Sequence, residues 1–215
     1  MCSFNFLTKR LFDISFGFIG FILLFPLFFI IAIIIFLDFR GPVFFTQIRV
    51  GLNKKPYTIF KFRTMVVNAE NMESGIFNLV NDSRITKFGK LLRNTSLDEL
   101  PQFINIIRGD MSFVGPRPPV SYELGDLNKL SPEFENRFTI KPGVTGLAQV
   151  SGRNELSWDE KVFFDNEYIK LFNKWGVLID IKLIFLTILK VVSNDGSYEI
   201  AENVEKDRQR INKED

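Results

Sequence analysis

A stretch of 24 residues without a formal charge, from Ile14 to Leu37, constrains the fold of this chain more than any other feature. Charged residues bracket it on both sides: Lys9, Arg10 and Asp13 precede it, and Asp38 and Arg40 follow it. At ~1.5 Å per residue a helix of this length extends about 36 Å, enough to cross the ~30 Å hydrocarbon layer of a bilayer. The stretch is therefore predicted to lie in a membrane.

Two features bear on how the stretch lies in the membrane. Pro26, near its middle, lacks an N–H and clashes with the carbonyl four residues back, so it is expected to kink a helix. Cations occur before the stretch, at Lys9, and after it, at Arg40 and Arg49, and such cations favour the cytoplasmic side. A re-entrant helix hairpin, with both ends on that side, satisfies both flanks. A single span with a tolerated proline is the alternative, and a cleaved signal peptide is the weaker one because no small-residue cleavage site follows.

The composition of the whole chain excludes several kinds of active site. The 215 residues include no histidine, which rules out histidine-dependent nucleophiles and every metal site that needs histidine. Cys2 is the single cysteine, so no intrachain disulfide is expected. The net charge is only +2, from 27 Lys and Arg against 25 Asp and Glu, so nucleic acid is not an expected partner. Catalysis must rest on carboxylates, amines, guanidiniums or hydroxyls.

A polar domain with a short hairpin is predicted after the apolar stretch. The ranges 43–49 and 57–64 are aromatic and β-branched, and the loop between them contains Gly and Pro, which predicts two short strands. A period of two places Lys61 and Arg63 on one face and the phenylalanines between them on the other. The two cations belong either to a binding surface or to a solvated strand edge.

Two helices follow the hairpin in the sequence. Ile85, Phe88 and Leu92 recur at helical spacing, which predicts an amphipathic helix over about 86–94 with a basic flank. Ser96-Leu97-Asp98-Glu99-Leu100-Pro101 then predicts the start of the next helix.

That start can be described in two ways. Ser96 and Glu99 fit a capping box, and Asp98 as the N-cap places Pro101 in the first turn, where its missing N–H costs little. On the simpler interpretation Asp98 and Glu99 are only caps, favoured by the positive end of the helix dipole. The functional interpretation treats the same two carboxylates as reactive groups.

Three turns rich in glycine and proline carry further cations. Arg117 lies between prolines in Gly115-Pro116-Arg117-Pro118-Pro119, where the restricted backbone prearranges a guanidinium for phosphate. A stiff linker with an incidental arginine is the rival interpretation. The ranges 141–146 and 151–154, the latter with Arg153, match neither the P-loop nor the dinucleotide-binding pattern.

The fold class predicted from these patterns is a helix-dominated α+β protein. Helices are predicted over 158–175 and 177–192, either packed on the domain or lying as amphipathic helices on the bilayer surface. The predicted organisation is a re-entrant membrane helix in 1–40, a cytoplasmic domain in 41–192 and a polar C-terminal tail in 193–215.

Taken in order, the motifs resemble one known family, the bacterial sugar transferases called small monotopic phosphoglycosyl transferases. The shared motifs are Lys9-Arg10-Leu11-Phe12-Asp13, the apolar stretch with Pro26, Lys61-Phe62-Arg63-Thr64-Met65, Ser96-Leu97-Asp98-Glu99-Leu100-Pro101-Gln102, Gly109-Asp110-Met111-Ser112-Phe113-Val114-Gly115-Pro116-Arg117-Pro118, Lys141-Pro142-Gly143-Val144-Thr145-Gly146 and Gly152-Arg153-Asn154. The resemblance covers roughly residues 7–192. One difference is the pair Phe25-Pro26 at the expected bend, where family members often have Ser-Pro.

The resemblance implies an activity and a location. The activity is transfer of a sugar 1-phosphate from a UDP-sugar to undecaprenyl (polyprenyl) phosphate with release of UMP, the first membrane step of capsule, exopolysaccharide or glycoconjugate synthesis. Asp98 is implied as the nucleophile that forms a phosphosugar intermediate, Glu99 as a ligand of Mg²⁺, and Arg93 and Arg117 as phosphate contacts. The implied location is the bacterial inner membrane, with the catalytic domain in the cytoplasm and the anchor in the lipid bilayer.

The chemistry of the residues is consistent with this activity. A carboxylate attacks phosphorus without losing a proton, which suits a protein that lacks histidine. The donor diphosphate carries about two negative charges, which converging cations are expected to balance. These cations are Lys61, Arg63, Arg93, Arg117 and Arg153. A Mg²⁺ ion between Asp98 and Glu99 would offset their mutual repulsion, and a helix N-terminus is expected to keep Asp98 ionised.

A second hypothesis comes from a different class. A non-catalytic, membrane-anchored adaptor would use the same cations to bind anionic lipid headgroups. The sequence leaves open which sugar is transferred and the oligomeric state, for which a homodimer is one option.

Overall fold

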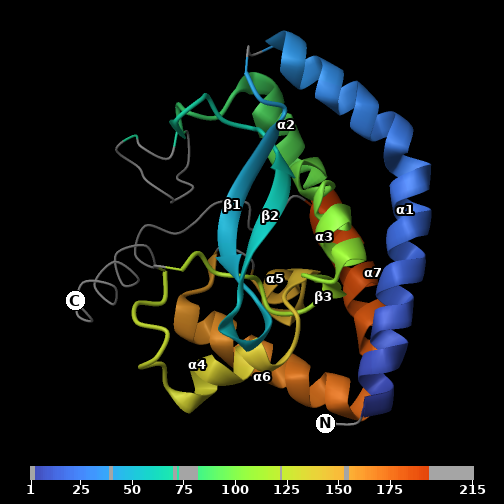
Figure 1. Ribbon diagram of the computed structural model, residues 1–215, viewed down its shortest axis with the longest axis vertical. Helices are drawn as coiled ribbons and strands as arrows, with labels where there is room; N and C mark the ends of the chain where they lie inside the picture. The colour runs from blue at the N-terminus through green and yellow to red at the C-terminus, as the bar shows by residue number, and fades with distance from the viewer. Residues whose placement is uncertain are drawn as a thin grey trace.

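The apolar stretch forms one long helix, α1 (Ser3–Asp38), along one side of the molecule (Figure 1). The structure is a computed structural model and describes residues 3–38, 41–69, 72, 82–121, 123–152 and 155–193. Helix α1 continues through Pro26 and bends along its length. A chain reversal at Pro26 is absent from this helix, because the proline is accommodated by a bend. The expectation that both ends of the apolar stretch lie on the same side of a membrane stays a prediction. By length and composition alone, α1 is able to cross a membrane.

The N-terminal part of α1 is fixed by a buried ion pair. Lys9 Nζ lies 2.5 Å from Asp180 Oδ2 in α7 (Val177–Ser193), and it also donates to the carbonyl of Val114 at 2.9 Å. The hydroxyl of Tyr168 donates to the other oxygen of Asp180 at 2.8 Å. Because a buried charge is costly without a partner, these bonds determine where α1 and α7 meet.

Two further charges of the Lys-Arg-x-x-Asp motif join α1 to the centre of the domain. Arg10 donates to two carbonyls at the end of α3 (Gln102–Arg108), at 2.7 and 2.9 Å. Asp13 accepts from the Ser112 hydroxyl and from the next backbone N–H, both in β3 (Ser112–Val114), at 2.9 and 3.1 Å. The motif therefore attaches the apolar helix to the rest of the chain.

The β-hairpin predicted for residues 43–64 is confirmed. Strands β1 (Phe44–Val50) and β2 (Pro56–Phe62) are antiparallel and joined by the turn η1 (Leu52–Lys54). Phe62 is 1% exposed and packs on Phe28 of α1, with ring centroids 5.6 Å apart. The alternation along β2 leaves Lys61 on the opposite face, away from α1.

The helices after the hairpin match the predicted ranges, but the predicted cap does not. Helix α2 (Lys87–Asn94) begins at Thr86, whose side chain accepts from the N–H of Gly89. The turn η3 (Leu97–Glu99) separates α2 from α3. Ser96 is left-handed, with φ 56°, and makes no side-chain cap bond, so the capping box is absent and Pro101, not Asp98, precedes α3.

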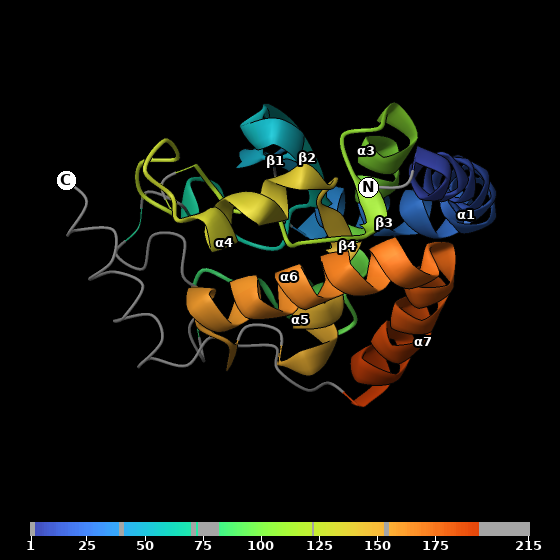
Figure 2. The same cartoon turned by 90° about the horizontal axis from the view of Figure 1, so that it is seen from below.

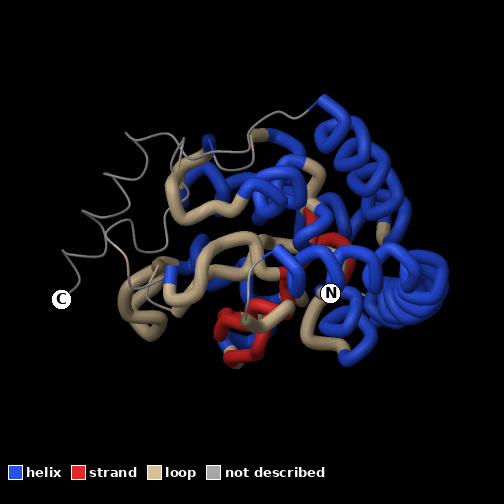
Figure 3. The backbone as a smooth tube through the Cα atoms, turned by 90° about the horizontal axis from the view of Figure 1, so that it is seen from above, coloured by secondary structure: helices blue, strands red, loops and turns tan. Residues whose placement is uncertain are grey.

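The C-terminal half is mostly helical (Figure 2), and helices also dominate the described chain as a whole (Figure 3). Its elements are α4 (Pro132–Asn136), η4 (Arg137–Thr139), β4 (Gly143–Thr145), α5 (Leu147–Ser151), α6 (Trp158–Trp175) and α7. Strand β4 pairs in parallel with β3. Helices α6 and α7 meet at a sharp corner at Gly176, where φ is 56° (Figure 2). Residues 194–215 of the predicted tail lie outside the described residues. The helix-dominated α+β fold class is confirmed.

Candidate active site

A cavity of about 820 Å³ lies among the hairpin, α2, η3, α5, α6 and α7. The predicted site residues that line it are Lys61, Arg63, Arg93, Asp98, Glu99 and Arg117. Arg153 lies outside the described residues, and Pro26 belongs to α1 and is not part of the cavity wall. The chain therefore brings together six predicted residues from four separate parts of the sequence.

The two carboxylates lie in the turn η3, immediately before α3. Asp98 is only 8% exposed but contributes to the cavity wall. Glu99 Oε1 accepts from Lys61 Nζ at 2.7 Å and from Arg117 at 3.4 Å. Glu99 thus contacts two cations, which offset the repulsion between its charge and that of Asp98.

The pKa values of the two carboxylates shift in opposite directions. Burial raises the pKa of Asp98, and the nearby charges of Lys61 and Arg93 offset this only in part. Burial acts on Glu99 too, but attraction to Lys61 and Arg117 outweighs it and holds the pKa below its ordinary value. The sequence predicts that a helix N-terminus keeps Asp98 ionised. Asp98 lies instead in the buried turn η3, and burial raises its pKa, so no helix N-terminus lowers it.

The loop that carries Arg117 is held by hydrogen bonds to its carbonyl groups. Arg137 donates to the carbonyl of Arg117 at 2.7 Å, and Arg49 donates to the carbonyl of Pro118 at 3.1 Å. Because the three prolines of this loop supply no N–H, its carbonyls carry much of the backbone hydrogen bonding, beside the N–H of Gly115, which donates to the carbonyl of Thr145 at 2.8 Å. Arg117 both lines the cavity and contacts Glu99, so it is not an incidental residue of a linker.

The remaining cations are placed by the end of β2 and by α2. Arg93 Nε donates to the Thr64 hydroxyl at 2.8 Å. The close approach of α2 to Thr64 depends on Gly89, where an added Cβ would lie 2.0 Å from the Thr64 carbonyl oxygen. Arg63 is 8% exposed, and it lines the cavity with Lys61, which favours the binding surface over the solvated strand edge.

The donor set for a magnesium ion is small. Among the described residues, no group of three or more Asp, Glu, Cys or His could hold a metal ion. Asp98 and Glu99 supply carboxylate oxygens, and the hydrogen bonds that Glu99 receives from described side chains all reach Oε1. Mg²⁺ usually takes one or two carboxylates and completes its shell with water and phosphate oxygens. The two residues therefore fit an ion bound together with a diphosphate, not a preformed metal cage.

Sequence reasoning missed several residues on the cavity wall. They are Arg49, Arg84, Lys90, Glu123, Gln149, Lys161 and Lys190. The cations interleaved in the predicted helix 86–94 were a usable signal for one of them, Lys90. Arg84 is 3% exposed and pairs with Asp82 at 2.6 Å, which the spacing alone did not indicate. The wall holds nine Lys and Arg and three Asp and Glu, so it suits an anionic ligand.

Comparison with known proteins adds a family and several relatives. The family model described as "Bacterial sugar transferase" matches residues 4–194. The UDP-glucose:undecaprenyl-phosphate glucose-1-phosphate transferase of Klebsiella pneumoniae is 42% identical over 196 residues, which are 90% of this chain and 42% of that protein. The galactosyl transferase CpsE of Streptococcus agalactiae is 40% identical, over 89% of this chain and 43% of that protein.

A shorter relative has nearly the same length as this chain. The exopolysaccharide production protein ExoY of Sinorhizobium fredii is 38% identical over 206 residues, which are 89% of this chain and 88% of that protein. By contrast, this chain spans less than half the length of the Klebsiella and Streptococcus relatives.

Proposed function

This chain belongs to the bacterial sugar transferase family, and we propose that it transfers a sugar 1-phosphate from a UDP-sugar to undecaprenyl phosphate. The observation that carries the proposal is one cavity in which Asp98 and Glu99 lie among Lys61, Arg63, Arg93 and Arg117. Relatives named for this reaction with glucose or galactose support it.

In the proposed first step, Asp98 acts as the nucleophile. One carboxylate oxygen of Asp98 forms a bond to the sugar-bearing phosphorus, and the bond from that phosphorus to the bridging oxygen breaks. UMP leaves with the bridging oxygen, and the sugar phosphate stays on Asp98. No proton has to be removed from an ionised carboxylate, so the absence of histidine from the chain does not hinder the step.

In the second step the lipid acceptor regenerates the enzyme. An oxygen of undecaprenyl phosphate forms a bond to the same phosphorus, and the bond between phosphorus and Asp98 breaks. The product is the undecaprenyl diphosphate sugar, and the Asp98 carboxylate is restored. Both steps use the same phosphorus, so one set of cations serves both transition states.

The cations have distinct positions in this proposal. Lys61 and Arg117 contact Glu99 and would also lie beside the diphosphate, while Arg93 and Arg63 line the cavity from α2 and the end of β2. A Mg²⁺ ion held by Glu99 and the phosphate oxygens of the donor would neutralise phosphate charge as a Lewis acid. The side chains of these cations would orient the UDP-sugar so that its sugar-bearing phosphorus faces Asp98.

We further propose that the reaction takes place at the bacterial inner membrane, with the cavity on the cytoplasmic side. The exposed apolar face of α1 supports a membrane location, and the acceptor is itself a lipid. The step would begin the assembly of an exopolysaccharide, capsule or glycoconjugate.

The decisive test measures UMP. Full-length protein in membranes, supplied with undecaprenyl phosphate, Mg²⁺ and a panel of UDP-sugars, should release UMP with at least one sugar. Asp98→Asn should lower this release by several orders of magnitude and should remove the phosphosugar adduct found by mass spectrometry of quenched wild-type protein. Asp126→Asn, a change in an exposed loop outside the cavity, is the matched control and should keep the release.

Two outcomes would contradict the proposal. Undiminished product from Asp98→Asn would exclude this carboxylate as the nucleophile. No release by the wild type with any UDP-sugar would instead favour the non-catalytic adaptor, which predicts binding to anionic vesicles without turnover.

A further inference from the structure

Gln149, in α5, has an amide that the reaction proposed above does not use. Its Oε1 and Nε2 are both buried, and neither has a hydrogen-bond partner among the described residues. The residue lines the cavity. Because a buried amide without partners is costly, native structures usually complete such a group with a ligand or water.

The wall around Gln149 differs from the wall around Asp98. The part of the cavity wall that β4, α5, α6 and α7 supply is mainly apolar. Its apolar residues are Val144, Val150, Trp158, Ile184 and Ile188. The Thr187 hydroxyl bonds to that of Thr145 at 2.6 Å. Lys161 and Lys190 also line this part, and Lys161 Nζ lies 4.9 Å from the centre of the Trp158 ring. An uncharged, flat ligand group fits a mainly apolar wall better than a diphosphate does.

The amide also lies beside the loop that carries Arg117. A Cβ added at Gly146 would lie 2.8 Å from Gln149 Oε1 and 2.3 Å from the carbonyl oxygen of Gly115. Gly115 is two residues from Arg117 in this loop. The amide therefore lies against the loop that carries Arg117, the proposed phosphate contact, so a nucleotide that binds both residues would place its base and its phosphates beside the same loop.

We propose that Gln149 recognises the uracil base of the donor nucleotide. Oε1 accepts a hydrogen bond from uracil N3–H, and Nε2 donates one to uracil O4. A primary amide presents an acceptor and a donor side by side, and the imide edge of uracil presents the complementary pair. The inference rests on the proposed function, because it names the part of a UDP-sugar that this amide contacts.

The test compares three probes on the full-length protein in detergent with Mg²⁺, using titration calorimetry. UDP carries base and phosphates, N3-methyl-UDP blocks the N3 donor, and inorganic pyrophosphate has no base. The wild type should bind UDP about tenfold to a hundredfold more tightly than N3-methyl-UDP. Gln149→Met should weaken UDP binding by a similar factor, abolish the penalty of the methyl group and leave pyrophosphate binding unchanged.

Two other variants separate loss of a hydrogen bond from a general change in packing. Gln149→Glu keeps the shape of the side chain and the acceptor for N3–H but loses the donor to O4, so it should bind UDP more weakly and still keep the penalty of the methyl group. Ile184→Val alters packing in the same wall without removing a polar atom, so it should keep the preference.

The outcomes separate this inference from the proposed function. Equal binding of UDP and N3-methyl-UDP by the wild type, or a methyl penalty that persists in Gln149→Met, would overturn the role of Gln149. Loss of pyrophosphate binding in both Gln149 variants would also overturn it, because the residue would then support the whole cavity. The proposed function fails differently, through a wild type that releases no UMP from any UDP-sugar.

Discussion

Asp98 and Glu99 are neighbours in the sequence, but their environments give them different roles. Asp98 is buried with an elevated pKa, while Glu99 is held ionised by Lys61 and Arg117. A carboxylate whose charge is stabilised by two cations is a weaker nucleophile, because the cations hold the electron density that would form the new bond. Asp98 is therefore the better candidate for attack on phosphorus, and Glu99 for organising the cations.

The motif order identified residues of the cavity but not how they contact one another. A sequence places Lys61 and Glu99 in separate motifs, and only the folded chain brings their side chains to 2.7 Å. Gln149 carried no signal, because an amide in a glycine-rich turn is ordinary until its burial is known. Burial depends on α6 and α7, which lie later in the chain and fold over the turn.

The pair formed by Arg137 and Asp165 predicts a pH dependence of stability. Asp165 Oδ2 lies 3.0 Å from the guanidinium, yet burial raises the pKa of Asp165 to about 6, and Arg137 offsets this only in part. The folded chain therefore holds a proton here more tightly than the unfolded chain, whose pKa is near 3.8. The contribution of this carboxyl to the free energy of unfolding should fall by about 2 kcal/mol as the pH rises from 4 to 6.

Comparison with Asp165→Asn isolates this contribution. Chemical unfolding in detergent at pH 4, 5, 6 and 7 gives the difference in free energy of unfolding between wild type and variant. We expect this difference to move in favour of the variant as the pH rises. Asp159→Asn, an exposed position on the same helix, controls for removal of a carboxylate. A difference that stays constant, or moves toward the wild type, would contradict the raised pKa.

At the scale of elements, α2 and its contact with residue 64 illustrate how packing sets the position of a functional group. Alanine is favoured over glycine in a helix by about 1 kcal/mol. At Gly89, however, a Cβ would lie 2.0 Å from the backbone oxygen of Thr64, so the helix must move away. We expect Gly89→Ala to lower the free energy of unfolding by about 1–3 kcal/mol and to reduce UMP release, because Arg93 moves with α2.

Gly17→Ala is the matched control for that experiment. Its added Cβ would lie 3.3 Å from the end of the Ile107 side chain, which can shift. Chemical unfolding and UMP release should therefore change little, within about 1 kcal/mol for stability. A Gly89→Ala variant as stable and as active as Gly17→Ala would show that α2 is free to move without consequence.

Local patterns predicted some elements and missed others for physical reasons. The hairpin and α2 follow from alternation and helical spacing within a few residues, and both formed within one or two residues of the expected bounds. The predicted capping box is absent because Ser96 adopts a left-handed conformation directly after α2. Nothing in the residues around Ser96 indicated that conformation. Strands β3 and β4 are three residues each and pair across a long separation, so no local period marks them.

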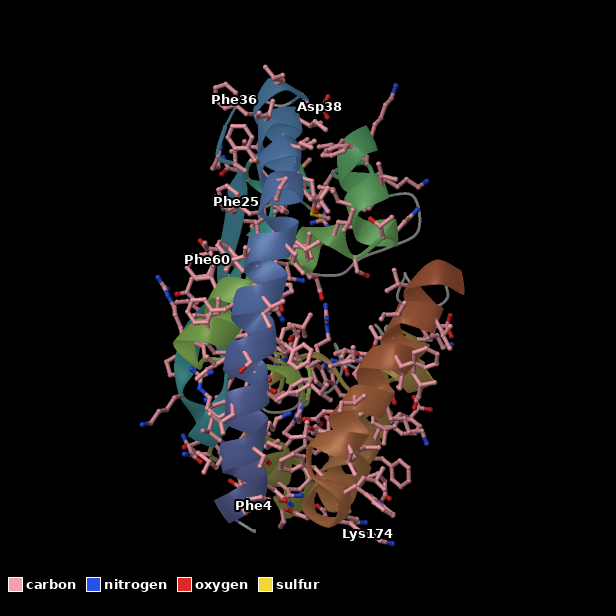
Figure 4. All side chains as sticks on the ribbon, turned by 90° about the vertical axis from the view of Figure 1, so that its right-hand side faces the viewer. Phe4, Phe25, Phe36, Asp38, Phe60 and Lys174 are labelled. Carbon is pink, nitrogen blue, oxygen red and sulfur yellow. The ribbon has the colours of Figure 1, made fainter. Side chains whose placement is uncertain are left out.

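At the scale of the whole molecule, both halves of α1 contact the same domain. Lys9 pairs with Asp180 near one end, and Phe28 packs on Phe62 toward the other. Between them, a Cβ at Gly20 would lie 2.5 Å from the ring of Phe103. The opposite face of α1 is exposed and apolar (Figure 4). A helix held against one domain at both ends cannot carry one end to the far side of a bilayer while the domain stays on the near side.

This arrangement predicts the outcome of a labelling experiment on membrane topology. In a Cys2→Ser background, Ser3→Cys reports the start of α1 and Lys55→Cys reports the exposed turn between β1 and β2. Both cysteines should react with a membrane-impermeant maleimide in inverted inner-membrane vesicles, and neither should react in right-side-out vesicles before detergent is added. The reason is that the contacts of Lys9 and Phe28 keep the whole helix beside the rest of the chain. Labelling of the two positions from opposite sides would mean that α1 spans the bilayer and that these contacts do not form in the membrane.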